Sequence, residues 1–265
     1  LESFINTQEY PLTLEDSTDT SELTKILENS YRAMNIAFIY EWTLLAEKAG
    51  INLFNVVKSI RKRPTHRNIM LPGFGVGGYC LTKDALLAAW SCKELYDHDY
   101  GLPLSMESIR INDKMPLHTL DLILSQQSIS EKRILLVGVS YREEVGDTRF
   151  SAAEIFARKA ISMGAEIYFH DPFVPEWSEL PEAKKVTSLE KAPSFDVYVL
   201  TTRHKAFLNK TATDWQEIIP SGKLVIDAFD IIDDEKIISL LKKQVQVLGV
   251  GKGHIKNLLS KGMPG

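Results

Sequence analysis

The chain has 265 residues, 44% hydrophobic and 25% charged, with a net charge of −4. This length and composition predict a globular protein of about two domains and exclude disordered, fibrous and disulfide-scaffold classes. No apolar run reaches the roughly 20 residues of a membrane helix, no secretory leader is seen, and the charge gives no reason to expect nucleic acid. Two cysteines are too few for a disulfide framework or a structural zinc site. We therefore expect a cytoplasmic protein without a metal.

The chain begins at Leu1 rather than Met, and its first 18 residues are polar and aperiodic. We expect residues 1–18 to be a tail or the remnant of a domain that the sequence lacks. Capping residues at 19–22 then open a helix whose apolar residues recur every three or four positions up to Gly50. They are Leu23, Ile26, Leu27, Met34, Ala37, Phe38, Trp42 and Leu45. Such an apolar face on a helix of about 30 residues packs either in a subunit interface or inside one domain.

A second short helix is predicted over residues 53–60, followed by an irregular stretch at 61–68. The segment at 72–84 then carries four closely spaced glycines, at positions 73, 75, 77 and 78. Helical periodicity returns at Ala85 and continues with breaks to about Gln126.

From Arg133 onward the pattern changes to short apolar runs. Strands are predicted at residues 134–139, 166–170, 196–200, 224–228 and 245–250, with a helix at 151–162. Strands that alternate with helices are typical of a parallel sheet covered on both faces. The expected fold class is therefore α/β, with a helical central domain at 19–130 and a Rossmann-like domain at 131–265.

The first predicted strand is followed by Gly138-Val-Ser-Tyr-Arg-Glu-Glu. A dinucleotide-binding unit would carry G-x-G-x-x-G there, so we expect this domain to bind another ligand at the same edge. The glycine-rich segment at 72–84 follows no predicted strand, and it therefore fails the structural test of a cofactor fingerprint.

Cys80 directly follows glycines that let the backbone approach a ligand and present its N–H groups. Lys83 and Asp84 place a positive charge and a potential general base close to the thiol in sequence. On spacing alone, however, a buried and inert cysteine is the commoner role. Cys92 lies in a helical pattern, and we expect it in the core.

Residues 72–84 resemble the active-site loop Gly-x-Gly-Gly-x-Cys-x-x-x-Asp of the UDP-glucose/GDP-mannose dehydrogenase family, the nucleotide-sugar 6-dehydrogenases. Three further stretches agree in the same order along the chain. Residues 22–37 are similar to the start of the family's central helix, and residues 111–116 to the end of its central domain. Residues 146–151 and 170–172 are similar to its C-terminal sugar-nucleotide domain.

The resemblance implies oxidation of the C6 alcohol of a UDP-sugar to a uronate, with two NAD molecules and a cysteine-bound thiohemiacetal and thioester. It implies that Cys80 is the nucleophile, that Lys25 and Asn29 hold the oxyanion and its water, and that Asp84 helps to activate water. Substrate contacts are implied for Leu71, Gly73, Phe74, Gly75, Gly77, Tyr141 and Arg142, and NAD contacts for Lys83 and Arg149.

Ordinary structural roles are open to the same residues. Lys25 and Asn29 can be solvated residues of a helix face. Asp84 can be a helix N-cap, and Arg149 can be one partner of a structural ion pair.

The chain departs from the family pattern at several positions. Arg142 stands in place of Lys, Phe150 and Ala152 in place of Glu and Pro, and Phe229 in place of the Arg of Asp-x-Arg. Pro64 stands where an arginine from the neighbouring subunit is expected, and Arg63 and Arg67 are alternative substitutes. The motif at 78–84 is closer to UDP-glucose enzymes and that at 31–37 to N-acetylhexosamine enzymes, so the sugar stays open.

The leading hypothesis is the central and C-terminal part of a UDP-sugar 6-dehydrogenase that lacks its NAD-binding domain. Such a chain is expected to bind a UDP-sugar, to be inactive alone, and to form a homodimer through its first helix. The alternative is a non-enzymatic module for sugar-nucleotide binding and dimerisation. A third hypothesis, a cysteine hydrolase or acyltransferase, needs a histidine to activate the thiol, and only His66 is near Cys80 in sequence.

Overall fold

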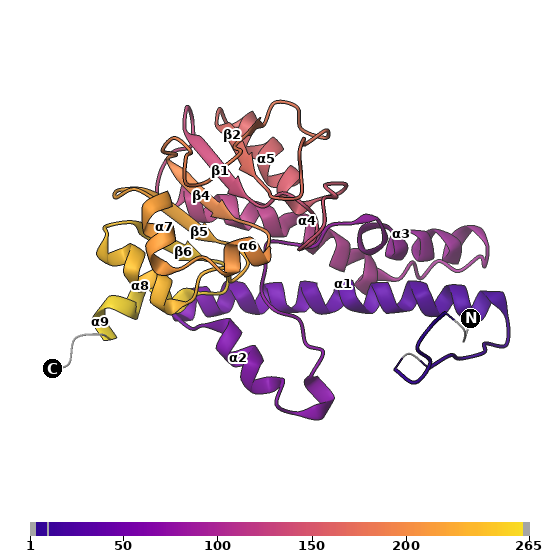
Figure 1. Ribbon diagram of the computed structural model, residues 1–265. Coiled ribbons are helices and arrows are strands. Elements are labelled where there is room, and N and C mark those ends of the chain that lie inside the picture. The colour runs from indigo at the N-terminus through magenta and orange to yellow at the C-terminus, as the bar shows by residue number, and fades with distance from the viewer. Residues whose placement is uncertain (1–3, 10, 262–265) are drawn as a thin grey trace.

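The computed structural model describes residues 4–9 and 11–261. A helical region comes first, followed by a sheet region (Figure 1). The helical region consists of α1 (Thr18–Ala49), α2 (Leu53–Ile60), the 3₁₀ helix η1 (Pro64–His66), α3 (Tyr79–Glu94) and α4 (Pro103–Leu124). The sheet region consists of β1 (Arg133–Val137), α5 (Ala152–Ser162), β2 (Glu166–His170), β3 (Lys184–Lys185), β4 (Val197–Leu200), α6 (Lys205–Leu208), α7 (Ala212–Ile218), β5 (Leu224–Asp227), α8 (Asp234–Lys242), β6 (Gln246–Gly249), η2 (Gly253–Asn257) and α9 (Leu258–Lys261).

The long first helix is confirmed, with a different start. Its N-cap is Ser17, whose Oγ accepts the N–H of Thr20, and not one of residues 19–22 as predicted. Gly50 ends α1 with φ 73°, in the left-handed region that favours glycine. Before α1, residues 4–9 and 11–17 form no helix or strand. Residues 1–3 and 10 of the predicted tail lie outside the described residues.

The helical pattern predicted beyond the glycine-rich segment is two helices, α3 and α4. Because α3 begins at Tyr79, Asp84 lies inside the helix, and the N-cap position belongs to Gly78. The N-cap alternative for Asp84 is therefore wrong. Cys92 is half-buried rather than in the core as predicted, because the buried face of α3 ends one turn earlier, at Ala88. In the described part of the chain no helix has the length and apolarity that crossing a membrane requires.

The sheet has six strands in the order β3-β2-β1-β4-β5-β6, and all neighbouring pairs are parallel. The five predicted strands are confirmed within one or two residues at their ends. The sixth, β3, was not predicted because it is two exposed lysines at the sheet edge, without any apolar signal. The strand order reverses between β1 and β4, which is the arrangement of a Rossmann-like fold.

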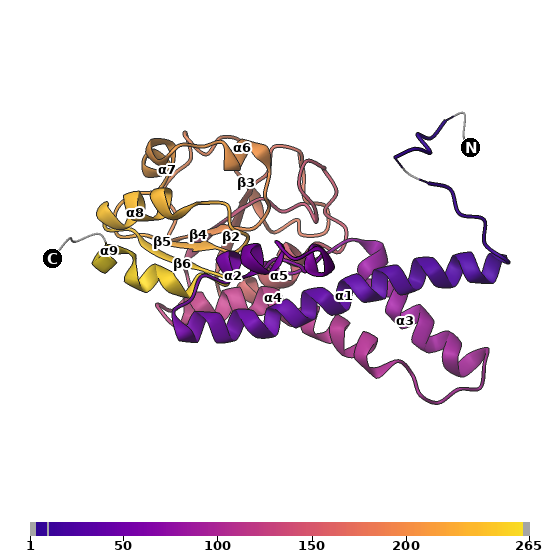
Figure 2. The same ribbon diagram turned by 90° about the horizontal axis from the view of Figure 1, so that it is seen from below.

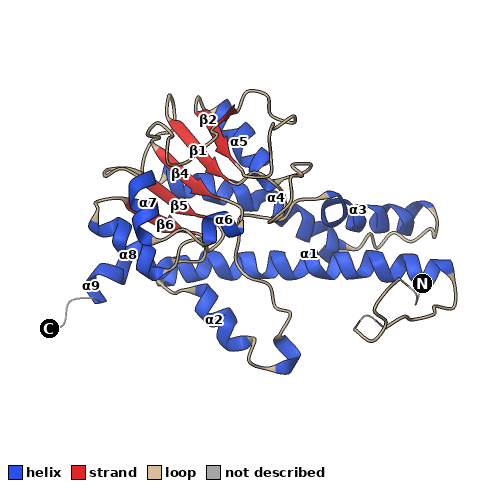
Figure 3. Ribbon diagram, in the orientation of Figure 1, coloured by secondary structure: helices blue, strands red, loops and turns tan. Residues whose placement is uncertain are grey.

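Helices cover both faces of the sheet (Figure 3). Side chains alternate along each strand, so Ile134 and Leu136 face α4 and α5, whereas Leu135 and Val137 face α7 and α8. Each side forms its own apolar core, with Phe156 on one side and Trp215 on the other as fully buried aromatic residues. The predicted α/β class is confirmed.

The helical region contacts the sheet region in two places, through α4 and through the end of α1. Helix α4 packs on α1 and α3 and also on α5 and β5 (Figure 2). At the end of α1, Glu47 accepts a hydrogen bond from the Gly251 N–H at 2.9 Å and lies 2.8 Å from His118 Nε2. These contacts fix the orientation of α1 relative to the sheet, and the candidate site lies between the two.

Candidate active site

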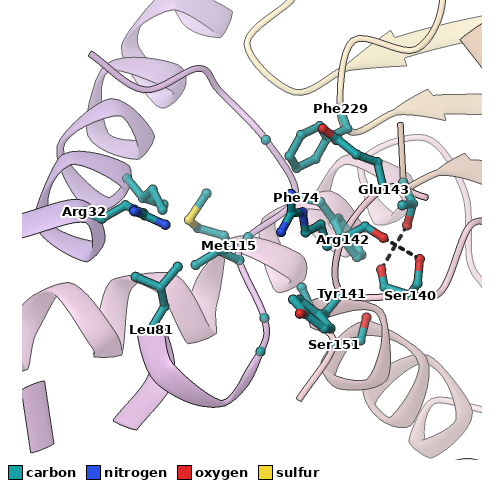
Figure 4. A pocket seen from close by; sticks show the side chains of 18 of the residues that line it. Arg32, Phe74, Leu81, Met115, Ser140, Tyr141, Arg142, Glu143, Ser151 and Phe229 are labelled. Carbon is teal, nitrogen blue, oxygen red and sulfur yellow. Dashed lines mark hydrogen bonds between the residues drawn. The ribbon is translucent and has the colours of Figure 1, made fainter. Parts of the chain in front are cut away.

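A cavity of about 660 Å³ lies between the helical region and the carboxyl edge of the sheet. Helix α1 and the glycine-rich loop at residues 71–78 line one side, and the loops that follow β1, β4 and β5 line the other (Figure 4). This volume is typical of a small-molecule site. Because β1 and β4 flank the reversal of strand order, the cavity lies at the switch point where open α/β sheets bind ligands.

Most of the predicted site residues line this one cavity, although they come from distant parts of the sequence. They are Lys25, Asn29, Leu71, Gly73, Phe74, Gly75, Gly77, Cys80, Tyr141 and Arg142. Asp84, Lys83 and Arg149 do not line it.

The glycine-rich loop packs closely against the sheet region. A Cβ atom at Gly77 would lie 2.2 Å from the Phe150 carbonyl oxygen, and one at Gly73 would lie 2.7 Å from the Phe229 ring. Asn112 of α4 holds the loop from the other side: its Oδ1 accepts the Val76 N–H and its Nδ2 donates to the Val76 carbonyl, both at 2.8 Å. Glycine is therefore needed at 73 and 77 for close packing.

Cys80 is exposed in the first turn of α3, directly after the loop. No side chain caps this helix, because the N-cap residue is Gly78. Uncapped N–H groups and the positive end of the helix dipole both favour negative charge at this position. The backbone around Cys80 therefore favours negative charge at the start of α3.

A hydrogen bond joins Asn29 of α1 to Asp84 of α3. Asn29 Nδ2 donates to Asp84 Oδ2 at 2.7 Å, and both side chains are buried. Asp84 follows Cys80 by four residues on α3 and so shares its side of the helix. The hydrogen bond fixes the amide of Asn29 at the cavity wall, and it excludes a solvated helix-face role for Asn29.

Lys25 lies one turn before Asn29 on α1 and forms an ion pair with Glu28 at 3.2 Å. The Lys25 hydrogen bond is the main reason why the pKa of Glu28 is lowered. The Lys25 side chain is 60% exposed, and exposed pairs of this kind contribute little to stability. The Lys25 ammonium group is therefore held only weakly by Glu28 at the edge of the cavity.

Lys83 and Arg149 lie outside the cavity. Lys83 Nζ is 4.2 Å from the centre of the Tyr79 ring, and this ring contacts the Phe150 ring at 5.6 Å between centroids. Arg149 is 75% exposed and pairs with Asp147 at 2.7 Å, which lowers the pKa of Asp147. The structural ion pair considered for Arg149 is thus present.

The cavity also has polar and aromatic residues to which the sequence assigned no role. The sequence contained a signal for Arg32, because it follows Lys25 by seven positions and Asn29 by three and so lies on the same helix face. Arg203 and Phe229 follow the carboxyl ends of β4 and β5. A search for polar and aromatic residues directly after predicted parallel strands would have found both.

Comparison with known proteins identifies the family. The model of the UDP-glucose/GDP-mannose dehydrogenase family, central domain, matches residues 19–114. The model of that family's UDP binding domain matches residues 135–234. The chain belongs to the UDP-glucose/GDP-mannose dehydrogenase family. The resemblance seen in the sequence motifs is confirmed, and the cavity lies between the two matched regions of this dehydrogenase family.

Several similar proteins are named as dehydrogenases of N-acetylated sugars. The UDP-N-acetyl-D-mannosamine dehydrogenase of Methanocaldococcus jannaschii is 30% identical over 239 residues, which are 88% of this chain and 52% of that protein. Its namesake from Pyrococcus horikoshii is 31% identical over 244 residues, 89% of this chain and 53% of that protein. The chain spans about half the length of the curated relatives it matches.

Solved structures agree with the fold. NDP-N-acetyl-D-galactosaminuronic acid dehydrogenase from Methanosarcina mazei Go1 matches with a TM-score of 0.79 and 25% identity, over 91% of this chain and 52% of that one. UDP-D-ManNAc dehydrogenase from Pyrococcus horikoshii matches with a TM-score of 0.71 and 28% identity, over 89% and 52%.

Proposed function

We propose that this chain is the central and C-terminal part of an NAD-dependent UDP-sugar 6-dehydrogenase, which oxidises the C6 alcohol of the sugar to a uronate. The observation that carries the proposal is the shared cavity: the switch point of the UDP binding domain and the residues Cys80, Lys25 and Asn29 line one space. A nucleotide bound at the sheet edge would extend its sugar toward the first turn of α3. Cys80 must stay reduced for this chemistry, so a cytoplasmic setting fits it.

The chain's own residues supply the covalent part of the reaction. Cys80 Sγ adds to the C6 aldehyde carbon, and the carbonyl oxygen becomes an oxyanion that takes up a proton to give a thiohemiacetal. Lys25 and Asn29, with the N–H groups of the first turn of α3, stabilise this oxyanion. The two hydrides that leave C6 would pass to two NAD molecules, one hydride to each; loss of the second hydride converts the thiohemiacetal to the thioester. Water then attacks the thioester carbon, and Cys80 leaves as a thiol while the uronate is released.

Asp84 has an indirect role in this proposal. The resemblance implied that it activates water, but its carboxylate is buried against Asn29 and does not border the cavity. Asp84 is therefore a positioning residue, which fixes the amide of Asn29 toward the reacting oxygen.

The chain offers only part of a site for NAD. Lys83 lies over the Tyr79 ring, this ring contacts Phe150, and Arg149 precedes Phe150 in the sequence; both cations suit the phosphates of a dinucleotide. In the residues that the structure describes, however, no G-x-G-x-x-G segment follows a strand. Lys83 and Arg149 supply positive charge but not the βαβ unit that binds a dinucleotide. The chain alone is therefore expected to have no dehydrogenase activity.

An N-acetylhexosamine is the proposed sugar, in preference to glucose. The relatives and the similar solved structures described above carry N-acetylated sugars in their names. The stretch at 31–37 on α1 also resembles enzymes of that kind, and Arg32 within it lines the cavity.

A thermal-shift panel tests the proposal on the chain as it is. UDP-N-acetylglucosamine, UDP-N-acetylmannosamine and UDP-glucose are compared, with GDP-mannose as the matched control. A ligand at 100 times its Kd stabilises the native state by about 2.7 kcal/mol, so we expect a rise in Tm that is largest for an N-acetylated UDP-sugar. No shift with any UDP-sugar would contradict the function. Absorbance at 340 nm with NAD present is expected to stay flat, and NADH formation would contradict the inactivity of the isolated chain.

We also propose a homodimer through α1. Its apolar residues at 23, 27, 31, 38, 42 and 45 follow each other at helical spacing and are between 47% and 64% exposed, whereas the small residues Ala33, Ala37 and Ala46 face the interior. Of the eight residues of the predicted apolar stripe, five are thus exposed, whereas Ala37 is buried and Ile26 and Met34 are half-buried. A second copy packing on the same stripe would cover it, as the two-fold symmetry of most dimers requires.

Sedimentation velocity at micromolar concentration is expected to give a dimer, and Trp42→Glu a monomer, because the charge would be buried at the interface. Trp90→Glu on α3 is the matched control, since Trp90 is 54% and Trp42 48% exposed. A monomeric wild type, or dissociation by Trp90→Glu alone, would contradict the interface.

A further inference from the structure

A buried pair of one histidine and one aspartate lies beneath the loop that carries Tyr141 and Arg142. His204 Nε2 and Asp171 Oδ2 are 3.1 Å apart, and both side chains have no solvent exposure. Asp171 directly follows β2 and His204 follows β4, on either side of the loop after β1. Neither residue lines the cavity, so any role they have in binding acts through the loop.

Asp171 holds the start of this loop. Its Oδ2 accepts the N–H groups of Val139 at 2.9 Å and of Ser140 at 3.1 Å, and its Oδ1 accepts the Phe173 N–H at 2.9 Å. Burial by itself would raise the pKa of Asp171, but the hydrogen bonds from His204 and from Val139 lower it to about 2. The carboxylate is therefore ionised at neutral pH and anchors two consecutive backbone groups.

His204 holds the other end of the loop. Its Nδ1 accepts the N–H of Glu144 at 3.0 Å, so the proton of a neutral ring is on Nε2. That Nε2–H points at Asp171 Oδ2 and also lies 3.1 Å from Ser140 Oγ. Ser140 Oγ in turn donates to the Arg142 carbonyl at 2.9 Å. The loop is thus held at both ends and in its middle by one imidazole and one carboxylate.

The arrangement is not a hydrolytic triad. In such a triad the serine and the aspartate bind opposite nitrogens of the histidine, whereas here Ser140 and Asp171 approach the same nitrogen, Nε2. The second nitrogen is occupied by a backbone N–H. The geometry suits holding a loop in place and does not suit activating a hydroxyl.

We propose that Asp171 and His204 are positioning residues that set the affinity of the cavity for the diphosphate of a nucleotide. They fix the loop so that the Arg142 guanidinium, which makes no ion pair with any side chain that the structure describes, faces the cavity (Figure 4). An unpaired guanidinium beside a cavity suits a bidentate contact with phosphate oxygens. This inference rests on the proposed nucleotide-sugar function.

Nitrogen-15 NMR of the imidazole rings tests, without any ligand, whether His204 accepts the Glu144 N–H and so holds the loop. At pH 7.5 the His204 signals, assigned by their loss in His204→Asn, are expected to show an unprotonated Nδ1 and a protonated Nε2. A proton on Nδ1 would overturn the inference, because Glu144 N–H would then face another donor.

Calorimetric titration with UDP tests the consequence. His204→Gln removes the acceptor for Glu144 N–H, and we expect its affinity for UDP to fall about tenfold, the upper range for one lost hydrogen bond. His204→Asn keeps an acceptor near the Nδ1 position and is expected to stay within about threefold of wild type. Wild-type affinity in His204→Gln, or an equal loss in both variants, would overturn the inference. Should His204→Gln not fold, the NMR measurement on the wild-type chain still decides it.

His170→Gln is the matched control. His170 also ends a strand and packs on the Phe207 ring, but its Nδ1 lies 2.8 Å from the Val186 carbonyl, away from the cavity loop. We expect an unchanged affinity for UDP, and a loss equal to that of His204→Gln would overturn the inference. Wild-type chain that binds no UDP would defeat the proposed function, and the NMR result would still decide whether the pair holds the loop.

Discussion

Replacing Cys80 by serine in the complete protein is expected to lower uronate release by about a thousandfold or more, because a hydroxyl in place of the thiol cannot form and release the thioester. Binding of the UDP-sugar is expected to stay within a factor of about two, since the change removes no charge and the glycine-rich loop is held by Asn112. Mass spectrometry of the sugar product measures the first effect, and calorimetry measures the second.

Cys92→Ser is the control for this prediction. Cys92 is the other cysteine in the sequence, on the same helix, and it is half-buried and outside the cavity. The rate of uronate release by this variant should equal that of the wild type. Uronate formed at the wild-type rate by Cys80→Ser would show that the nucleophile is another group.

Replacing Lys252 by methionine is expected to lower the free energy of unfolding by about 3–5 kcal/mol, the usual effect of removing one partner of a buried ion pair. Lys252 is 1% exposed, and its Nζ lies 2.8 Å from Asp227 Oδ2 and 2.7 Å from Asp230 Oδ1. Burial by itself would lower the pKa of Lys252, but the two carboxylates outweigh burial and raise it. The variant leaves the buried Asp227 without its cation, whereas Asp230 keeps its ion pair with Arg203 at 3.5 Å.

Lys252→Met should also change the shape of the cavity. Asp227 accepts the N–H groups of Phe229, Ile231 and Ile232 and so shapes the turn that presents the Phe229 ring. Urea denaturation of the isolated chain measures the stability change. Lys184→Met is the control, because the Lys184–Glu166 pair is exposed and should contribute less than about 1 kcal/mol. Equal losses in both variants would contradict the prediction for Lys252.

The sequence identified the elements that have a strong local signal. The strands at the sheet centre are runs of apolar residues, and α1 has more than four turns of helical period, so both could be placed to within two residues. The short helices α6, α7, α8 and α9 were missed, although the equally short α2 was predicted, because four to nine residues do not always carry enough periodicity to separate a helix from a loop. Ser17 was passed over as the cap because several neighbours also suit that position.

The site was predictable where a motif carries it and not where the tertiary fold assembles it. Cys80 and its glycines are adjacent in the sequence, and Lys25 and Asn29 share a helix face. The hydrogen bond from Asn29 to Asp84 joins residues 55 positions apart, and the pairing of Asp171 with His204 depends on the strand order. Neither the pattern of apolar residues nor the spacing of one helix contains that information.

The contact between Glu47 and Gly251 has a consequence for synthesis of the chain. The two residues are 204 positions apart, and at roughly 5–20 residues per second a ribosome needs about 10–40 s to add that length. During this interval α3 and α4 can already pack on α1, but Glu47 at its end lacks the Gly251 N–H. The contact that joins the end of α1 to the sheet region forms only after β6 has emerged, so a ribosome stalled before residue 251 leaves a nascent chain in which this contact is missing.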